Sequence, residues 1–539
     1  MDPLKKLQSL APTQVITMKI YGATKKLLQK RKLQKIKTVI FENFKGYCDN
    51  TSIHGLKYVV NKSLHPIERI FFAVSFICVV YGAAVFVGKI YEKWNYTPML
   101  VSINPKSTHI IDDPFPAVTI CNLNQVYKAK AQQFAVDSVD YTMIQTICKR
   151  DANISKVNAI KDWRNFRNLI KDISPPCSKM ILKCKYGGTN FNCSEIFRPI
   201  LTDNGVCCSF NMVDPKFMYR EYPRDYQPVD WSSEAGYPAI LPEKFIPMKS
   251  LGAGESVGLS FVLDVESEEY YCSTSDSIGF KILLHNPLEV PNMREIGLLL
   301  SPGRETKIRI QPDKIESERY LRYISKSSRK CLFEDEEYLE MYNEYTQRNC
   351  GVQCSAGEIL ESCGCLPYYV PMIYGNETIC GVRDYSCAER IRMETLHIKN
   401  SRRVCSEYCA PSCNDLSYFP SFFSAPLLNT SFQGEEDKLD KNINSTYLEK
   451  NIAVVKIYFR DSTYRSQKNS DFIGATDFLS NIGGIISLFF GFSFISLAEL
   501  VYYGILRPLR LIFYIQKSQV ARLAKTQKRK SIQLFFRNQ

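Results

Sequence analysis

The sequence IFFAVSFICVVYGAAVFVGKI occupies residues 70–90, and a second apolar sequence, FIGATDFLSNIGGIISLFFGFSFISLAELVYYGIL, occupies residues 472–506. Each is long enough to cross a hydrocarbon core of about 30 Å as a helix. The first carries no charge before Lys89, which is unusual for a buried core helix, and it begins too late for a cleaved signal sequence. Two crossings place both termini on one side of a membrane and residues 91–471 on the other.

Basic side chains flank both apolar segments. Residues 1–53 carry 11 Lys or Arg and 3 acidic residues, and residues 507–539 carry 9 Lys or Arg and no acidic residue. Flanking Lys and Arg stay in the cytosol, so regions 1–69 and 507–539 are predicted to be cytosolic. Nucleic-acid binding is the rival explanation of basic tails, but their position beside the spans favours topology and contact with anionic membrane lipids. Lys25–Lys37 fits either an amphipathic helix on the membrane or a solvated tail.

Cysteines indicate an oxidising compartment for the region between the spans. Of the 20 cysteines, 18 lie there, and the other two are Cys48 and Cys78. Such density is typical of a disulfide framework. A zinc module is the alternative for the dense cluster at 331–413, but its spacings match no ordinary tetrahedral set, so no metal site is predicted. Sequons in the same region predict N-glycosylation at Asn153, Asn192, Asn376, Asn429 and Asn444.

Residues 91–471 show a mixed pattern of strands and helices. Alternating apolar residues predict strands, and a longer apolar period predicts helices. The predicted strands are Ala117–Leu123, Gly258–Val265, Gly279–Leu284, Lys307–Ile310 and Ile452–Phe459, and the predicted helices lie near Ser138–Arg150, Ile160–Ile170 and Glu334–Thr346. The charged stretch Gln433–Asn444 is predicted to be an exposed loop. The fold class is therefore an α+β membrane protein, with two transmembrane helices and a large disulfide-rich extracellular domain.

The second apolar segment has a seam of small and polar residues. Helical spacing places Asn481, Gly484, Leu488 and Gly491 in one stripe. Such a stripe suits either an aqueous pore or a helix–helix packing face. The carboxylates of Asp477 and Glu499 favour a pore, because dry packing would leave them unpaired. One helix cannot enclose a pore, so several copies are predicted to meet.

Four patches of this chain resemble the degenerin/epithelial sodium channel superfamily, which includes acid-sensing channels, and they look most like its insect pickpocket branch. They are Thr51–Leu56 (TSIHGL), Phe115–Asn122 (FPAVTICN), the cysteines from Cys331 to Cys413, and Leu479–Glu499 (LSNIGGIISLFFGFSFISLAE). The His-Gly pair in the first patch is a weak signal by itself, whereas the second and fourth patches together are strong. The resemblance covers nearly the whole chain and implies a trimer.

The resemblance assigns roles to residues of the pore. It implies a selectivity filter at Gly491, Phe492 and Ser493, where backbone carbonyls can replace water around a small cation. Phe492 is larger than the middle residue of many relatives, a departure that looks usual in the pickpocket branch. The other implied residues are Asn481, Gly484 and Leu488 as pore lining, His54, Gly55 and Ser480 in gating, and Ser487 in contact with the blocker amiloride.

The resemblance also implies which cysteines pair. In the dense cluster the implied bonds are Cys331–Cys413, Cys350–Cys409, Cys354–Cys405, Cys363–Cys387 and Cys365–Cys380, and elsewhere they are Cys121–Cys207 and Cys184–Cys193. Four cysteines are left over. We expect them to pair as Cys148–Cys177 and Cys208–Cys272.

Three classes of function compete. An ATP-gated two-span channel would use an Asn-Phe-Arg motif, which occurs at Asn165–Arg167, but far from the second span. A membrane-tethered adhesion protein or ectoenzyme has no use for a polar seam in its second span, and no catalytic motif appears between the spans. The sequence therefore predicts a channel subunit and not an enzyme.

The resemblance implies a channel that conducts sodium across the plasma membrane and is amiloride-sensitive in type. The channel is expected to be voltage-independent because the spans contain no Arg-rich sensor. An extracellular chemical or mechanical stimulus is expected to gate it, through a ligand that the sequence does not identify. The predicted partners are sodium ions, membrane lipids and related subunits in a homo- or heterotrimer, with no nucleic acid and no cofactor.

Overall fold

The structure is a computed structural model, and two compact units make up the chain. It describes residues 41–96, 99–148, 165–220, 231–241, 245–273, 275–373, 375–396, 405–428, 444–511, 513–514 and 517. We call the units the helical unit (Met1–Pro98 with Phe472–Gln539) and the cysteine-rich unit (Met99–Asp471). Several predictions lie outside the described residues, namely those for Lys25–Lys37, for most of Gln433–Asn444, and for Asn153 and Asn429.

The helical unit is built on α3 (Pro66–Tyr96), which continues beyond both ends of the predicted span. Among the described residues, α3 is the one helix long and apolar enough to cross a membrane unaided. The second apolar segment was expected to be one helix over 472–506, and this is wrong. It consists of α17 (Ala475–Phe490) and a second helix, Phe494–Leu511, bent by 77°, which pass the same test only as a pair. The second helix includes α18 (Phe494–Val501) and the π-helical turn η7 (Tyr502–Leu506).

The cysteine-rich unit contains an eight-stranded and a five-stranded sheet. The larger has the order β1-β17-β13-β15-β9-β5-β6, with β14 also paired to β13, and the smaller has the order β12-β11-β3-β8-β7. The strands of the larger sheet are β1 (Met99–Ile103), β5 (Ile181–Tyr186), β6 (Thr189–Phe191), β9 (Leu259–Asp264), β13 (Arg304–Ser317), β14 (Asp415–Pro426), β15 (Ile452–Phe459) and β17 (Gln467–Asp471). Those of the smaller sheet are β3 (Ala117–Asn122), β7 (Phe197–Thr202), β8 (Gly205–Phe210), β11 (Phe280–His285) and β12 (Leu298–Leu300).

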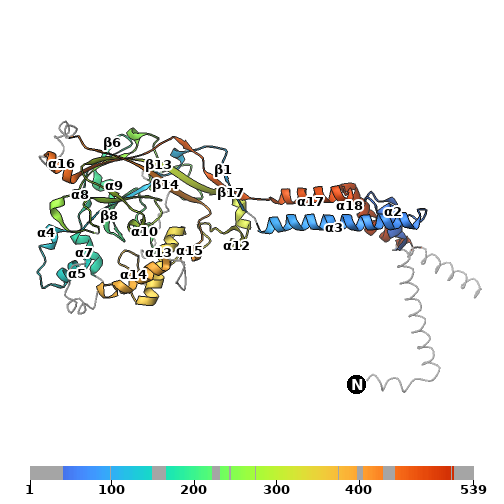
Figure 1. Cartoon of the computed structure of the whole chain (residues 1–539), viewed down its shortest axis with the longest axis horizontal. Helices are drawn as coiled ribbons and strands as arrows, with labels where there is room; N and C mark the ends of the chain where they lie inside the picture. The colour runs from blue at the N-terminus through green and yellow to red at the C-terminus, as the bar shows by residue number, and fades with distance from the viewer. Residues whose placement is uncertain are drawn as a thin grey trace, which may run out of the picture. The chain divides into compact units, whose positions relative to one another are not determined.

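Short pairs and helices complete this unit. The two-stranded pairs are β4 (Asn124–Tyr127) with β10 (Tyr270–Ser273) and β2 (Thr108–His109) with β16 (Thr463–Tyr464). The helices are α4 (Lys128–Ala131), α5 (Val139–Ile147), α7 (Phe166–Ile173), α8 (Cys177–Met180), α9 (Cys193–Ile196), α10 (Pro215–Met218), α11 (Met293–Ile296), α12 (Lys326–Arg329), α13 (Gln347–Cys363), α14 (Val382–Leu396), α15 (Cys405–Tyr408) and α16 (Ser445–Asn451). In Figure 1, α13, α14 and α15 gather on one side of the sheets.

Both sheets contribute to one buried core. Phe115, which opens the FPAVTICN patch, lies at its centre, with ring centroids 5.3 Å from Tyr186, 6.0 Å from Phe210 and 5.6 Å from Phe459. Edge-to-face contacts of this kind stabilise a core beyond the apolar area that they bury. The predicted strand Ile452–Phe459 is β15 itself, because its alternation follows the burial pattern along a strand with one face in this core.

One predicted helix is wrong. Residues 334–346 form turns and bridges instead of a helix. The backbone N–H of Asn343 donates to Met218, and Met341 accepts from Arg220, at 2.9 and 3.0 Å. These bonds to a distant segment replace the bonds that a helix would make four residues back. The helix α13 begins one residue after Thr346, whose side chain accepts the N–H of Asn349 as an N-cap.

The cysteine-rich unit has nine disulfide bonds among the described residues. All seven bonds that the resemblance implies are present. The five between 331 and 413 are nested. Two of them join α13 to α15 and to α14, and a third joins α13 to Cys409, directly after α15. Because each bond closes a loop of the unfolded chain, it contributes roughly 2–4 kcal/mol of stability.

The expected pairing of the remaining four cysteines is wrong. The bonds are Cys148–Cys272 and Cys177–Cys208, with Cα atoms 5.4 and 5.8 Å apart. Cys148 follows α5, which packs against the β4–β10 pair that carries Cys272. Cys177 opens α8 and belongs with Cys208 to the main core. Packing of elements that are distant in sequence therefore decides these two bonds.

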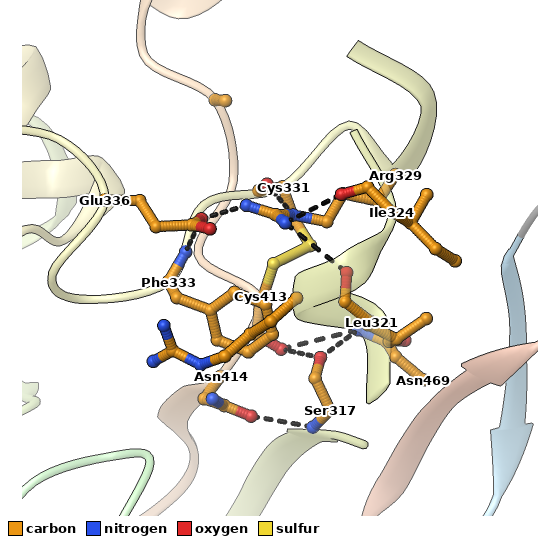
Figure 2. The surroundings of a disulfide bond; sticks show 12 residues. Ser317, Leu321, Ile324, Arg329, Cys331, Phe333, Glu336, Cys413, Asn414 and Asn469 are labelled. Atoms are coloured by element: carbon orange, nitrogen blue, oxygen red, sulfur yellow. Dashed lines mark hydrogen bonds and ion pairs between the residues drawn. A yellow bond between two sulfur atoms is a disulfide. The ribbon is translucent and has the colours of Figure 1, made fainter. Parts of the chain in front are cut away.

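The Cys331–Cys413 bond lies beside a buried arginine (Figure 2). The guanidinium of Arg329 is 1% exposed and donates to the carbonyls of Cys331 and Ile324, each at 3.0 Å. It also pairs with the Glu336 carboxylate and lies over the ring of Phe333. A planar guanidinium presents five donors spread over three nitrogens, whereas an ammonium presents three donors from one nitrogen. Arg329 therefore links α12 to the first rung of the disulfide cluster.

The end of β11 and the turn after it bury two ionisable side chains, His285 and Glu289. The ring of His285 lies 2.8 Å from the Thr119 hydroxyl and 2.9 Å from the Asn286 carbonyl, and burial lowers its pKa to about 4. Burial raises the pKa of Glu289 to about 8, although the Arg348 guanidinium 3.2 Å away opposes that shift. Both side chains are therefore mainly neutral at pH 7.

Raising the pH from 6.5 to 8 is expected to lower the free energy of unfolding through Glu289. Between the ordinary pKa of 4.5 and about 8, the folded state binds more protons at Glu289 than the unfolded state does. Stability therefore falls as pH rises, by at most about 1.4 kcal/mol per pH unit. The opposite slope from His285 acts below its ordinary pKa of 6.5. Burial also raises the pKa of Glu344 to about 7, which adds to the slope in the same direction. The contribution of Glu289 is therefore the difference between the wild type and a variant that lacks this carboxyl group.

Thermal unfolding of the purified full-length protein at several pH values measures this slope. The variant Glu289→Gln cannot titrate at this position and keeps the size of the side chain. It should lose stability less steeply than the wild type between pH 6.5 and 8. Equal slopes in the two proteins would contradict the assignment to Glu289.

Candidate ion-conduction site

Aromatic side chains hold α17 against α3, and the two helices run side by side in Figure 1. Trp94 stacks on Phe478 with ring centroids 4.7 Å apart, and Phe86 contacts Phe489 at 5.8 Å. Gly82 makes room for this approach, because a Cβ there would lie 3.0 Å from the Phe489 ring. One face of α17 is thus used for packing within the chain.

The predicted seam lies away from this contact. Asn481, Gly484 and Leu488 are all exposed, and the side chain of Leu488 is 80% exposed. A Cβ at Gly484 would have no neighbour within 4 Å. Ser480 and Ser487, predicted in gating and blocker contact, are exposed on the same helix. Within the described part of the chain these three positions of the seam are exposed, so they are available to an aqueous path or to another copy.

The helix α17 ends at Gly491, which the resemblance places in the selectivity filter. Gly491 has φ 65° and ψ 24°, and its N–H donates to the Ser487 carbonyl at 2.7 Å. A left-handed residue at this point is a common helix terminator, and glycine adopts it without steric strain. The chain then leaves the helix for Gly491, Phe492 and Ser493 before α18 begins.

Ser493 starts the next helix as its N-cap. Its hydroxyl accepts the N–H of Ser496 at 3.4 Å, and the Ser496 hydroxyl accepts the N–H of Ser493 at 3.1 Å. This reciprocal capping box satisfies two backbone donors that would otherwise be unpaired. Leu497 donates its N–H to the Ser493 carbonyl at 3.1 Å. Among the described residues, the carbonyls of Gly491 and Phe492 accept no recorded backbone hydrogen bond.

The predicted gating pair lies against this break. The N–H of His54 donates to the Phe490 carbonyl at 3.0 Å. Its ring is so close that a Cβ at Gly491 would be 2.5 Å from two ring atoms. Gly55, at φ 84°, turns the chain into α2 (Leu56–Val60) directly afterwards. The structure therefore brings His54 and Gly55 to Gly491, from a position more than 400 residues earlier in the sequence.

Sequence reasoning missed the role of Ser52. Its hydroxyl lies 2.7 Å from the Ser496 hydroxyl, and its backbone N–H donates to the Glu499 carboxylate at 3.0 Å. Ser496 is fully buried. Glu499 stood out as a carboxylate inside an apolar segment, which was the available signal. Nothing in the sequence indicated that its partner was Ser52.

Residues 41–55, which we call the N-terminal segment, make a second contact with the helix after the break. Residues 41–50 are helical, and Thr51 donates its N–H to the Tyr47 carbonyl at 2.8 Å. Tyr47 packs edge-on against Tyr503 at 5.8 Å, and the Arg507 guanidinium lies 5.2 Å above the Tyr503 ring. The N-terminal segment thus contacts α17 and the following helix on both sides of the break.

Other predicted positions lie in the cysteine-rich unit. Asn192, Asn376 and Asn444 are exposed, and Asn192 and Asn444 cap α9 and α16 with their side-chain oxygens. The Asn-Phe-Arg tripeptide opens α7, where Phe166 is buried and Arg167 donates to the Val370 carbonyl. Searched over the described ranges, the chain contains no group of three His, Cys, Asp or Glu side chains able to hold a metal.

The chain combines a long apolar helix, a broken helix pair and a nested disulfide cluster, and comparison with known proteins gives its family. Residues 47–503 match the family model described as amiloride-sensitive sodium channel, so the chain belongs to this family of ion channels, which are not enzymes. Pickpocket protein 28 of Drosophila melanogaster is 36% identical over 86% of this chain and 78% of its own length. Pickpocket protein 11 of the same species is 24% identical, and acid-sensing ion channel 4 of Mus musculus is 23% identical. The match with Pickpocket protein 11 covers 86% of this chain and 76% of that protein's length. The match with the mouse channel covers 85% of this chain and 78% of the mouse channel's length.

Proposed function

We propose that this protein is a subunit of a voltage-independent, amiloride-sensitive, sodium-selective channel of the plasma membrane. The apolar helix α3 and the bent pair formed by α17 and the helix after it each cross the bilayer, and both termini are cytosolic. Three copies, identical or related, enclose a pore lined by the exposed seam of α17. Sodium ions, membrane lipids and sibling subunits are its partners, and an extracellular chemical or mechanical stimulus opens it.

The helix break at residues 491–493 is the observation that carries this proposal. An uninterrupted span would engage its carbonyls in helical hydrogen bonds. Here the Gly491 and Phe492 carbonyls accept no recorded backbone bond within the described residues. Carbonyls released in this way can replace the hydration shell of a small cation where three copies meet. We therefore assign the filter to Gly491, Phe492 and Ser493, and the path above it to Asn481, Gly484 and Leu488.

The neighbouring positions have separate roles in the proposal. Ser487 lies one helical turn before Gly491 on an exposed face, where an amiloride molecule entering the pore would meet it. Ser480 lies two turns further from the filter, where side-chain size controls how closely the helices of three copies approach. His54 and Gly55 act in gating because their contact with the break supports one geometry of the filter.

The variant Ser493→Cys is expected to shift the reversal potential in bi-ionic sodium and potassium solutions. A thiol is a weaker acceptor than a hydroxyl, so the N-cap of α18 weakens by about 1 kcal/mol and the filter loosens. Sodium preference should fall while surface delivery stays normal. The variant Ser75→Cys, on α3, is the matched control and should leave the potential unchanged. A Ser493→Cys channel with the wild-type reversal potential would place the filter elsewhere.

A further inference from the structure

Ser52 contacts two residues of the helix that follows the break. Its hydroxyl lies 2.7 Å from that of Ser496 and 3.2 Å from the Glu499 carboxylate. Its backbone N–H reaches the same carboxylate oxygen at 3.0 Å. In the described part of the chain, the two recorded hydrogen bonds of the Glu499 carboxylate both come from Ser52. The charge of Glu499 is therefore stabilised by the N-terminal segment and not by its own helix.

One set of directions satisfies all of these hydrogen bonds at once. A carboxylate oxygen accepts, and in this set the Ser52 hydroxyl donates to Glu499. The lone pairs of that hydroxyl then accept the proton of the Ser496 hydroxyl. The Ser496 oxygen in turn accepts the N–H of Ser493 at 3.1 Å. A continuous chain of donors runs from Ser493, through Ser496 and Ser52, to Glu499.

We infer that Ser52 is a positioning residue for the filter, which it couples to the Glu499 carboxylate. With Ser52 in place, Glu499 is held toward the N-terminal segment and Ser493 is fixed as the cap of α18. When the segment moves away, the carboxylate loses both donors and the Ser496 hydroxyl loses its acceptor. The position of the N-terminal segment then changes filter geometry and the placement of the Glu499 charge together. This inference rests on the proposed function of residues 491–493.

The strength of the link follows from the charge of its acceptor. Hydrogen bonds to ionised groups are stronger than bonds between neutral groups, and losing one changes a two-state population by roughly tenfold or more. The variant Ser52→Ala removes the hydroxyl but keeps the backbone N–H, whereas Ser52→Thr keeps both. The variant Ser52→Asp places a second negative charge against Glu499, and Glu499→Gln removes that repulsion.

The experiment measures the sodium-to-potassium permeability ratio of full-length channels from reversal potentials, together with surface delivery. Ser52→Ala and Glu499→Gln should each lower the ratio severalfold, and the double variant should lower it no further, because both act on one link. Ser52→Thr should retain the wild-type ratio. Ser52→Asp should lower it most, and Ser52→Asp combined with Glu499→Gln should recover it to the level of Glu499→Gln alone. Ser63→Ala is the matched control, since the Ser63 hydroxyl donates to nearby Asn61.

Two results would overturn the inference. One is a Ser52→Ala channel with the same ratio as Ser63→Ala. The other is a double variant whose loss is the product of the two single losses, which would mean that Ser52 and Glu499 act independently. Either result is distinguishable from failure of the proposed function, because the Ser493→Cys channel tests the filter without altering Ser52. If Ser493→Cys shifts the reversal potential and the Ser52 variants do not, the filter stands and the link to Ser52 is rejected.

Discussion

Replacing Gly491 by alanine is expected to abolish sodium current while the protein still reaches the cell surface. Gly491 has φ 65°, where an L-residue with a side chain is disfavoured by roughly 1–2 kcal/mol. The new Cβ would also lie 2.5 Å from the His54 ring. Either the ring or the turn must move, and both belong to the proposed filter and gate. Because the break is local, folding of the cysteine-rich unit is not affected.

A second substitution separates the effect of backbone strain at Gly491 from the effect of the clash with the His54 ring. The double variant His54→Ala with Gly491→Ala removes the clash and keeps the backbone strain, so it should recover part of the current with altered selectivity. The variant Gly88→Ala on α3 is the matched control, because a Cβ there meets no neighbour within 4 Å. Whole-cell current and surface biotinylation measure the outcome. A Gly491→Ala channel with normal current and selectivity would show that residues 491–493 do not form the filter.

Replacing Arg329 by methionine is expected to destabilise the cysteine-rich unit by about 3 kcal/mol or more. Methionine preserves much of the volume but removes every donor. It leaves the carbonyls of Cys331, Leu321 and Ile324 without this partner, and it leaves Glu336 without its counterion (Figure 2). Buried acceptors without partners are costly, and a partly buried charge without a partner is more so. The affected site adjoins the first rung of the disulfide cluster.

Retention inside the cell and a lower unfolding temperature are the measurable consequences. The variant Arg329→Lys should be intermediate, because one ammonium cannot reach all of the acceptors that the guanidinium serves. The control is Arg460→Met, since the side chains of Arg460 and its partner Asp461 are 66% and 68% exposed, and exposed pairs contribute little. If the Arg329→Met protein were as stable as Arg460→Met, the residues around Arg329 would have rearranged without losing stability, and the prediction would be wrong.

Local patterns were sufficient for several parts of this fold. The strand β15 and the apolar helix α3 follow from alternation and from length, which act over neighbouring residues. A helix end at Gly491 is consistent with the flexibility of glycine alone. Seven disulfide bonds came from a resemblance and not from spacing, since spacing alone leaves many connectivities open.

Long-range packing decided the rest. Residues 334–346 have helical propensity. However, the Asn343 N–H donates to Met218 and the Met341 carbonyl accepts from Arg220, so tertiary contacts override the local preference. The bonds Cys148–Cys272 and Cys177–Cys208 depend on which helix packs against which strand.

At the site, the sequence by itself determined which residues are polar or small within an apolar segment, because composition and period are local properties. Only the tertiary structure decided that Ser52 meets Glu499 across 447 positions. A hydrogen bond requires a specific geometry, but the sequence does not indicate which residue will be the partner of a given polar side chain. This contact therefore forms only when the N-terminal segment folds back onto the break.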